Sequence, residues 1–267
     1  MKEEQLQKEI GWLLKEKYKG KLTAAAKRDL ARLKAGEPVN YLIGFVEFAG
    51  CKIDLSLKPF IPRPETEYWT QKAIEEIAKD VPLQRKGTSF ACLDMFAGSG
   101  CIGIAVLKNI DKAHVDFVEK KKRFLRQIRI NAKLNHINPR GYRILEGNIF
   151  QLKGVSVERS MGLYDYIFAN PPYVAEPRKK SVQASVLKYE PREALFAGKD
   201  GLLYIKRFLK EARKHLNPGG KIYMEFDSPQ KQEIGMLLKK FGYSSWQFYK
   251  DQYNKWRFVL ISSIPFT

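Results

Sequence analysis

The spacing of hydrophobic and polar residues divides the chain into two parts with different patterns. In the first part, residues 3–17 repeat apolar side chains at helical spacing, which predicts an amphipathic helix. A second helix is expected over residues 23–34, starting at Thr23, a typical N-cap residue. Short apolar runs broken by glycines over residues 41–60 predict a hairpin, and residues 63–79 have a helical pattern again.

From about residue 90 onward, short apolar runs alternate with helical patterns. Strand, helix and strand at this spacing predict an α/β fold, with a parallel sheet and helices on both of its faces. The last two runs can form an antiparallel edge, whereas residues 174–198 are weakly patterned and predict a functional loop or lid. The predicted strands cover residues 90–96, 113–118, 142–145, 164–169, 221–226, 244–250 and 256–262.

Charge and composition narrow the range of partners. The 267 residues carry a formal net charge of +19, which admits nucleic acid, a ribosome-associated protein or an acidic protein surface, or only a solvated surface. Three widely spaced cysteines, an odd number, favour reduced thiols in a cytoplasmic protein. The three histidines form no metal-ligand pattern, and no apolar run approaches the ~18 residues of a membrane span. We therefore expect neither a metal centre nor a membrane segment.

A glycine-rich turn follows the first strand of the α/β part. The segment DMFAGSGCIG begins at Asp94 and spaces Gly98, Gly100 and Gly103 as GxGxxG. Glycines permit positive φ angles and let the backbone approach a ligand at the carboxyl ends of the strands. The motif admits two ligands, a dinucleotide pyrophosphate or the methionine part of S-adenosylmethionine. Asp94 favours the second, because a carboxylate can hold an ammonium through the turn but would repel phosphate.

Further candidate ligand-binding residues end the next two strands. Glu119 lies where a carboxylate can accept hydrogen bonds from both ribose hydroxyls, a geometry that both cofactor classes use. It can also be simply an acid favoured by the dipole of the following helix. Asn148 and Ile149 follow the third strand, where an amide can pair with an adenine edge and an apolar side chain can pack on its face.

The most specific signal is an Asn-Pro-Pro-Tyr turn after the fourth strand. The prolines at 171 and 172 have fixed φ angles and no N–H, which leaves rigid, free carbonyl oxygens. The side-chain oxygen of Asn170 and the carbonyl of Pro171 can then accept both hydrogens of a conjugated NH₂ group, while Tyr173 stacks on its plane. Two acceptors hold this poor nucleophile in line with the sulfonium methyl group and stabilise the positive charge that develops on the nitrogen. Both a glutamine amide and an adenine amino group fit this geometry.

Taken together, these segments resemble the class I methyltransferases that modify amino nitrogens, and more specifically the HemK/PrmC-type release factor glutamine methyltransferases. The resemblance runs from about residue 22 to the end of the chain. Besides the two turns it includes blocks that begin at Pro38, Ile61, Tyr189, Asp200 and Pro218, the last followed by Glu225.

This resemblance implies a Rossmann-like domain over residues 63–267 with a mostly parallel seven-stranded sheet, preceded by a helical region at 1–36 and a hairpin linker at 37–62. It implies an enzyme that uses S-adenosylmethionine, releases S-adenosylhomocysteine, and methylates the glutamine N5 in the GGQ loop of peptide chain release factors. Separately, we expect a cytoplasmic monomer. The implied cofactor contacts are Asp94, Phe96, Ala97, Gly98, Ser99, Gly100, Glu119, Asn148, Ile149 and Asn170, and the implied catalytic residues are Asn170, Pro171, Pro172 and Tyr173.

The chain departs from the family pattern at three places. Asn148 replaces the usual acid, Asp227 stands where glycine is usual, and the helical region before the hairpin is about half the usual length. Because that region helps to bind the release factor, a ribosomal protein or RNA remains an alternative partner, and an adenine-N6 methyltransferase remains an alternative function. Lys122, Arg126 and Arg129 line one predicted helix face, which is either solvated or in contact with nucleic acid.

Overall fold

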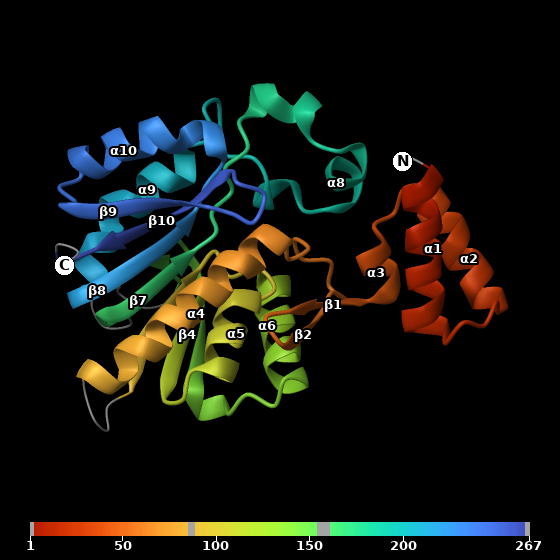
Figure 1. Ribbon diagram of the computed structural model, residues 1–267, viewed down its shortest axis with the longest axis horizontal. Helices are drawn as coiled ribbons and strands as arrows, with labels where there is room; N and C mark the ends of the chain where they lie inside the picture. Colours follow the sequence, from red (N-terminus) through yellow and green to blue (C-terminus); the bar gives the residue numbers. More distant parts are fainter. Residues whose placement is uncertain (1–2, 85–88, 154–160, 265–267) are drawn as a thin grey trace.

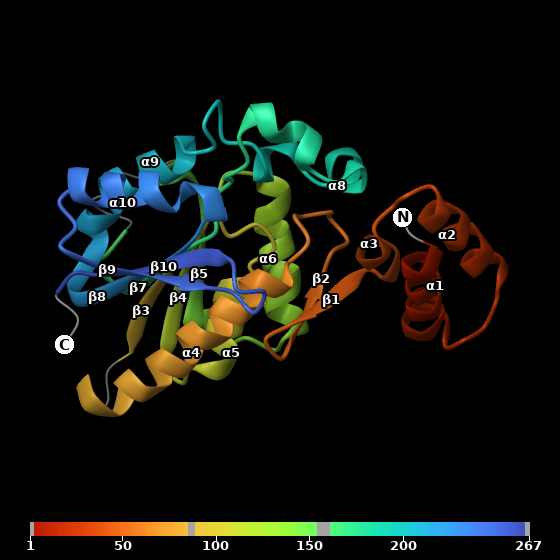
Figure 2. The same ribbon diagram turned by 45° about the horizontal axis from the view of Figure 1, so that its top comes forward.

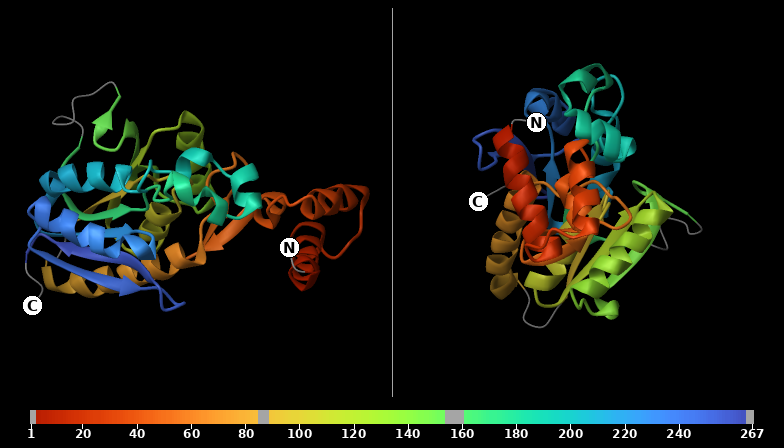
Figure 3. Two further views of the ribbon diagram at one scale, coloured as in Figure 1. Left: turned by 90° about the horizontal axis from the view of Figure 1, so that it is seen from above. Right: turned by 90° about the vertical axis from the view of Figure 1, so that its right-hand side faces the viewer.

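The computed structural model describes residues 3–84, 89–153 and 161–264. It consists of a large α/β body with a small group of helices at one end (Figures 1 and 3). The chain starts in this helical group, and its carboxyl end lies on the far side of the body. Within the described ranges, none of the helices combines the length and the apolar character that crossing a membrane requires.

One twisted sheet forms the centre of the body. Its strands lie in the order β6-β5-β4-β3-β7-β8-β10-β9. The five strands from β5 to β8 run parallel, whereas β10 pairs antiparallel with both β8 and β9, and β6 pairs antiparallel with β5. The strands are β3 (Phe90–Met95), β4 (Ala113–Glu119), β5 (Tyr142–Asn148), β6 (Gln151–Leu152), β7 (Tyr164–Ala169), β8 (Leu216–Glu225), β9 (Ser245–Lys250) and β10 (Trp256–Ser262).

Helices cover both faces of this sheet, and each face has its own hydrophobic core (Figure 2). On one face, Trp69 and Ile104 belong to a cluster that the hairpin also joins. On the other face, Phe208 and Ile234 pack against the opposite side chains of the strands. The first face is covered by α4 (Pro64–Gln84), α5 (Cys101–Asn109) and α6 (Lys122–Leu134), and the second by α9 (Leu203–Ala212) and α10 (Lys231–Lys240).

The amino-terminal helices α1 (Glu3–Tyr18), α2 (Ala24–Lys34) and α3 (Val39–Ile43) enclose a small core of their own that includes Leu13, Leu33 and Leu42. The buried carboxylate of Asp29 joins α2 to α1 by accepting hydrogen bonds from Lys17 and Tyr18. A two-stranded hairpin of β1 (Phe45–Phe48) and β2 (Cys51–Asp54) follows and leads into the body.

Three amide side chains on one face of α6 hold the hairpin against the body. Gln127, Asn131 and Asn135 are buried and are spaced four residues apart, so they form one row along the helix. The amide oxygen of Asn131 accepts a hydrogen bond from the N–H of Asp54, and that of Asn135 accepts one from Lys52. Their NH₂ groups donate to the carbonyls of the same two residues. These side-chain amides therefore satisfy the edge of β2 in the way that the backbone of a neighbouring strand would.

The pattern of elements expected from the sequence is confirmed, including the parallel sheet with an antiparallel edge and the N-cap of α2 at Thr23. The two-residue strand β6 extends the expected seven strands. Sequence patterning missed α3, whose five residues are mostly apolar and too short to show helical spacing. It also gave no helix within residues 174–198, where the structure has α8 (Ala184–Tyr189) between short 3-10 turns.

Candidate functional site

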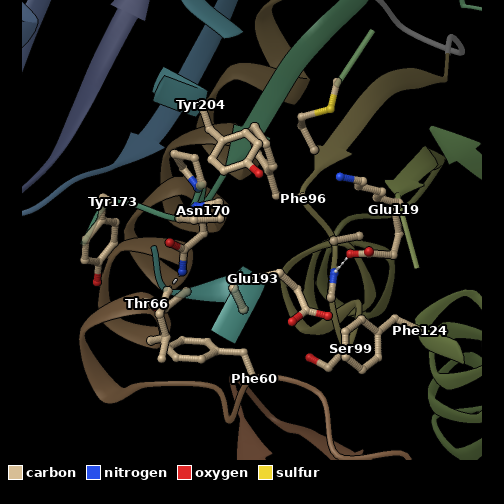
Figure 4. Close-up of a pocket in the computed structure, with 18 of the residues that line it drawn as sticks. Phe60, Thr66, Phe96, Ser99, Glu119, Phe124, Asn170, Tyr173, Glu193 and Tyr204 are labelled. Atoms are coloured by element: carbon tan, nitrogen blue, oxygen red, sulfur yellow. Dashed lines mark hydrogen bonds between the residues drawn. The ribbon is translucent and has the colours of Figure 1, made fainter. Parts of the chain in front are cut away.

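A cavity of about 540 Å³ opens where the parallel strands end. Its walls come from the turns after β3, β4, β5 and β7, from the start of α4 and from residues 182–195 (Figure 4). The carboxyl ends of parallel strands are the usual place for a ligand in an α/β sheet. The described lining residues include Phe96, Ala97, Gly98, Ser99, Glu119, Asn148, Ile149, Asn170, Pro171, Pro172 and Tyr173, so most of the sequence candidates meet in one site.

The glycine-rich turn forms the floor of this cavity beside β3. Gly98 and Gly100 have φ angles of +55° and +79°, which glycine adopts without steric cost. Phe96 also has a positive φ, +64°, although it carries a side chain. Such a conformation costs free energy and is found most often at functional sites. Gly103 serves packing instead, because a Cβ there would lie 2.3 Å from the ring of Phe117.

Asp94 lies beneath this turn, and the cavity lining does not include it. It is fully buried, and its Oδ2 accepts a hydrogen bond from the N–H of Gly103 at 3.0 Å. No described residue donates a hydrogen bond to its Oδ1. Burial, with the nearby Glu119 carboxylate adding to it, raises the pKa of Asp94 to about 7. The unpartnered oxygen suits a cationic group on the other side of the turn.

Glu119 ends β4 and faces the turn. One carboxylate oxygen accepts a hydrogen bond from the N–H of Gly98 at 2.9 Å, and the other accepts one from the N–H of Lys121 at 2.7 Å. Burial raises the pKa of Glu119, while these backbone donors oppose the rise. The residue therefore links the glycine-rich turn to Lys121, just before α6, and also lines the cavity. Since a carboxylate oxygen can accept more than one hydrogen bond, both oxygens remain able to accept hydroxyl groups.

The adenine side of the predicted site lies at the end of β5. Asn148 and Ile149 line the cavity, and Ile149 has a φ angle of +59°. Phe96 closes this region from the other side, and its ring makes edge contacts with Tyr204 and Phe208. Apolar walls with one amide are suited to a flat heteroaromatic ring.

The Asn-Pro-Pro-Tyr turn follows β7 and forms the opposite wall. Pro171 and Pro172 are buried, and the Nδ2 of Asn170 donates a hydrogen bond to the Oγ1 of Thr66 at 3.2 Å. Figure 4 shows this amide nitrogen pointing towards Thr66. Among the described residues, none donates to the Oδ1 of Asn170 or to the carbonyl of Pro171. Both oxygens are therefore available as acceptors next to the cavity.

Residues 182–195 border the cavity from above the sheet. Val186 of α8 and Leu195 line it with apolar surface, and Glu193 reaches into it and pairs with Lys121 at 3.0 Å. The segment is fixed at its other side by Glu190, whose carboxylate binds Arg63 at 2.6 Å.

Asp227 is one of the departures from the family pattern. It forms an ion pair with Arg178, which lies in the loop of residues 174–198. It also caps the short 3-10 turn Ser228–Gln230. The aspartate thus takes a structural role that glycine could not provide, and it ties the loop to the end of β8.

Thr66 and Glu225 lie within segments that resemble the family, but sequence patterns alone assign them no role. Thr66 lies two residues into α4 and lines the cavity, while Glu225 ends β8 and binds Thr66, Trp69 and Tyr173. The sequence does contain a signal for Glu225, because this carboxylate ends the apolar segment KIYME. The carboxyl end of such a strand lies at the edge of the sheet where ligands bind.

Comparison with known proteins places this site in context. Residues 63–249 match the family model described as "Conserved hypothetical protein 95". The chain is 32% identical to a release factor glutamine methyltransferase of Flavobacterium psychrophilum over 87% of this chain and 78% of that protein. It is also 32% identical to the one of Bacteroides thetaiotaomicron, over 91% and 84%.

Among solved structures, a methyltransferase from Pyrococcus furiosus has the same fold, with a TM-score of 0.55. It is 22% identical, and the match covers 87% of this chain and 95% of that one. Sequence similarity over most of its length, together with the class I methyltransferase fold and the Asn-Pro-Pro-Tyr turn in the cavity, shows that this chain belongs to the family of release factor glutamine methyltransferases.

Proposed function

We propose that this protein transfers the methyl group of S-adenosylmethionine to the side-chain amide nitrogen of a protein glutamine, the glutamine of the GGQ loop in peptide chain release factors. The observation that carries the proposal is the pair of free acceptors, Asn170 Oδ1 and the Pro171 carbonyl, in the cavity that the glycine turn also lines. The family relationship supports the same reaction.

The residues of the cavity fit the cofactor. Glu119 would accept the ribose hydroxyls, Asn148 and Ile149 would contact the adenine, and the turn from Phe96 to Gly100 would pass under the methionine part. The unpartnered oxygen of Asp94 lies beneath that turn, where it favours an ammonium group over phosphate. When bound, S-adenosylmethionine supplies an electrophilic methyl group on a positively charged sulfur.

The residues of the turn after β7 would bind and activate the acceptor amide. Its lone pair is delocalised, so the nitrogen is a weak nucleophile until its two hydrogens are held by acceptors. Asn170 Oδ1 and the Pro171 carbonyl would accept these hydrogens, and the prolines keep both oxygens fixed. As positive charge develops on the nitrogen, these preorganised dipoles stabilise it without having to reorient. Tyr173 would pack against the amide plane.

The helical region at 1–36 would take part in recognising the protein acceptor, with the hairpin at 37–62 as its connection to the catalytic domain at 63–267. Its exposed apolar side chains Trp12 and Leu22, with 41% and 59% of their surface exposed, are suited to a protein contact. The row of amides on α6 holds the hairpin in one position relative to the cavity.

Methyl transfer from labelled S-adenosylmethionine tests this function. A release factor, a ribosomal protein and RNA are offered separately, together with a release factor whose GGQ glutamine is replaced by alanine. We expect label only in the intact release factor. Label in RNA would instead assign the enzyme to the amino-methyltransferases of nucleic acids, since adenine presents a similar conjugated NH₂ group.

Asn170→Ala tests whether Asn170 acts in the chemical step. Removing one preorganised hydrogen-bonding group costs roughly 10²–10³ in turnover where comparable groups have been removed. Because Asn170 contacts the acceptor amide more than the cofactor, affinity for S-adenosylhomocysteine should change little. A variant that methylates at the wild-type rate would show that the turn is only structural.

A further inference from the structure

A buried carboxylate at the end of β8 joins three parts of the site. Glu225 is 1% exposed, and burial raises its pKa although its hydrogen-bond donors oppose the rise. Its Oε2 accepts hydrogen bonds from the hydroxyl of Thr66 and the indole N–H of Trp69, both at 2.7 Å. Its Oε1 accepts one from the hydroxyl of Tyr173 at 3.0 Å. Two of these donors are in α4, and the third is in the turn after β7.

These contacts fix the direction of each hydrogen bond. The carboxylate of Glu225 accepts the hydrogen bonds from all three donors, so Thr66 uses its single hydroxyl hydrogen for Glu225. The oxygen of Thr66 is then left as an acceptor, and its partner at 3.2 Å is the side chain of Asn170. Only the NH₂ of that amide can satisfy it. The Oδ1 of Asn170 is therefore turned away from Thr66 and is kept free for another donor.

We propose that Glu225 and Thr66 are positioning residues for methyl transfer, which hold the amide of Asn170 in the one orientation that presents its oxygen to the acceptor nitrogen. This inference rests on the proposed function, because it deepens the role given there to Asn170. Glu225 also fixes Tyr173, so a single carboxylate orients the first and the last residue of the Asn-Pro-Pro-Tyr turn.

The same chain of hydrogen bonds strengthens the acceptor. By accepting its hydrogen bond, the carboxylate of Glu225 polarises the hydroxyl of Thr66, which in turn polarises the amide of Asn170, since linked hydrogen bonds reinforce one another in a low-dielectric interior. The Oδ1 of Asn170 then carries more negative charge than an isolated amide. It is better able to stabilise the positive charge that develops on the acceptor nitrogen.

If Glu225 served only to hold α4 against the sheet, the hydrogen bond from Thr66 would not be needed. The indole of Trp69 already joins the two elements, and its ring is fully buried among the side chains of that core. The hydroxyl of Thr66 adds a second hydrogen bond from α4 to Glu225 and also connects Glu225 to Asn170. Its removal should accordingly affect the reaction more than the fold.

The test is Thr66→Val, which keeps the shape of the side chain and removes the hydroxyl. Thr70→Val is the matched control, because Thr70 lies one turn later in α4, is equally buried and donates only to the carbonyl of Thr66. For Thr66→Val we expect single-turnover methyl transfer to a glutamine acceptor to slow by about tenfold to a hundredfold, as misplaced reacting groups do. Affinity for S-adenosylhomocysteine should stay near that of Thr70→Val, thermal stability should fall further than in Thr70→Val because buried Glu225 loses a donor, and Thr66→Ser should restore most of the rate.

A second measurement does not depend on the substrate. In the ligand-free protein, the side-chain NH₂ resonances of Asn170 in nitrogen-15 NMR spectra should shift in Thr66→Val and remain in place in Thr66→Ser and Thr70→Val. Unchanged resonances in Thr66→Val, or methyl transfer at the rate of Thr70→Val, would overturn the positioning role. If the wild-type protein methylates no glutamine acceptor, the proposed function fails, whereas the NMR comparison still decides whether Thr66 orients Asn170.

Discussion

Glu119 makes contacts that stabilise the fold and also lines the cavity. Its two carboxylate oxygens accept hydrogen bonds from the backbone of Gly98 and Lys121, so it joins the glycine turn to the start of α6. The sequence left open whether this residue binds a ribose or serves the helix N-terminus. In the structure Glu119 accepts a hydrogen bond from Lys121, the residue before α6, and it also lines the cavity, so both roles stay predictions.

Glu119→Ala separates these two roles. Charged hydrogen bonds are worth roughly 1.5–3 kcal/mol each, so affinity for S-adenosylhomocysteine, measured by calorimetry, should fall by about that amount. Glu119→Gln is the matched control, because it keeps one acceptor oxygen and should lose less. If Glu119→Ala stays folded and binds the cofactor product as tightly as the wild type, the carboxylate has no part in ligand binding.

At the scale of elements, the row of amides on α6 connects the hairpin to the glycine-rich turn after β3. The NH₂ of Asn131 donates to the carbonyl of Ser99 at 2.9 Å as well as to Asp54. Asn135 makes equivalent bonds to Lys52 but does not reach the turn. Two residues four positions apart thus share the hairpin contact, and only Asn131 also supports the ligand site.

We expect Asn131→Ala and Asn135→Ala to lower the free energy of unfolding to a similar extent, about 2–4 kcal/mol, since each leaves buried backbone groups without partners. Only Asn131→Ala should also weaken binding of S-adenosylhomocysteine, because the carbonyl of Ser99 loses its support. Chemical denaturation and calorimetry on both variants provide the comparison. Equal affinities in the two variants would mean that the turn keeps its conformation without Asn131.

The sequence predicts the elements of this region but not most of the contacts between them. The strands and the two turns were predictable, because alternating apolar runs, glycines and prolines act locally on the backbone. Contacts between distant segments were not predictable from such patterns. The bond from Thr66 to Glu225 spans 159 positions, and the amides of α6 bind residues 70 or 77 positions earlier. Nothing in the local spacing of those residues indicates their partners.

At the scale of the whole molecule, the net charge of +19 can influence binding of a partner only through the basic residues that lie near the binding site. An acceptor glutamine has to enter the cavity, so the partner must lie close to its mouth. The start of α6 borders this mouth through Lys121 and Phe124, and the exposed side chain of Lys122 lies beside them. Lys133 is exposed near the other end of the same helix, roughly 16 Å away at a rise of 1.5 Å per residue.

If the charge steers an acidic acceptor to the cavity, the association rate should fall as salt rises from low to physiological concentration. At physiological ionic strength, Lys122→Gln should lower this rate more than Lys133→Gln, although both remove one charge, because the Debye length of about 8 Å is shorter than the distance between the two side chains. Stopped-flow association of each variant with the methyl-accepting protein, at several salt concentrations, measures the effect. Equal rates for the two variants would place the docking charges elsewhere, and a rate that does not respond to salt would mean that the charge serves something other than binding the acceptor.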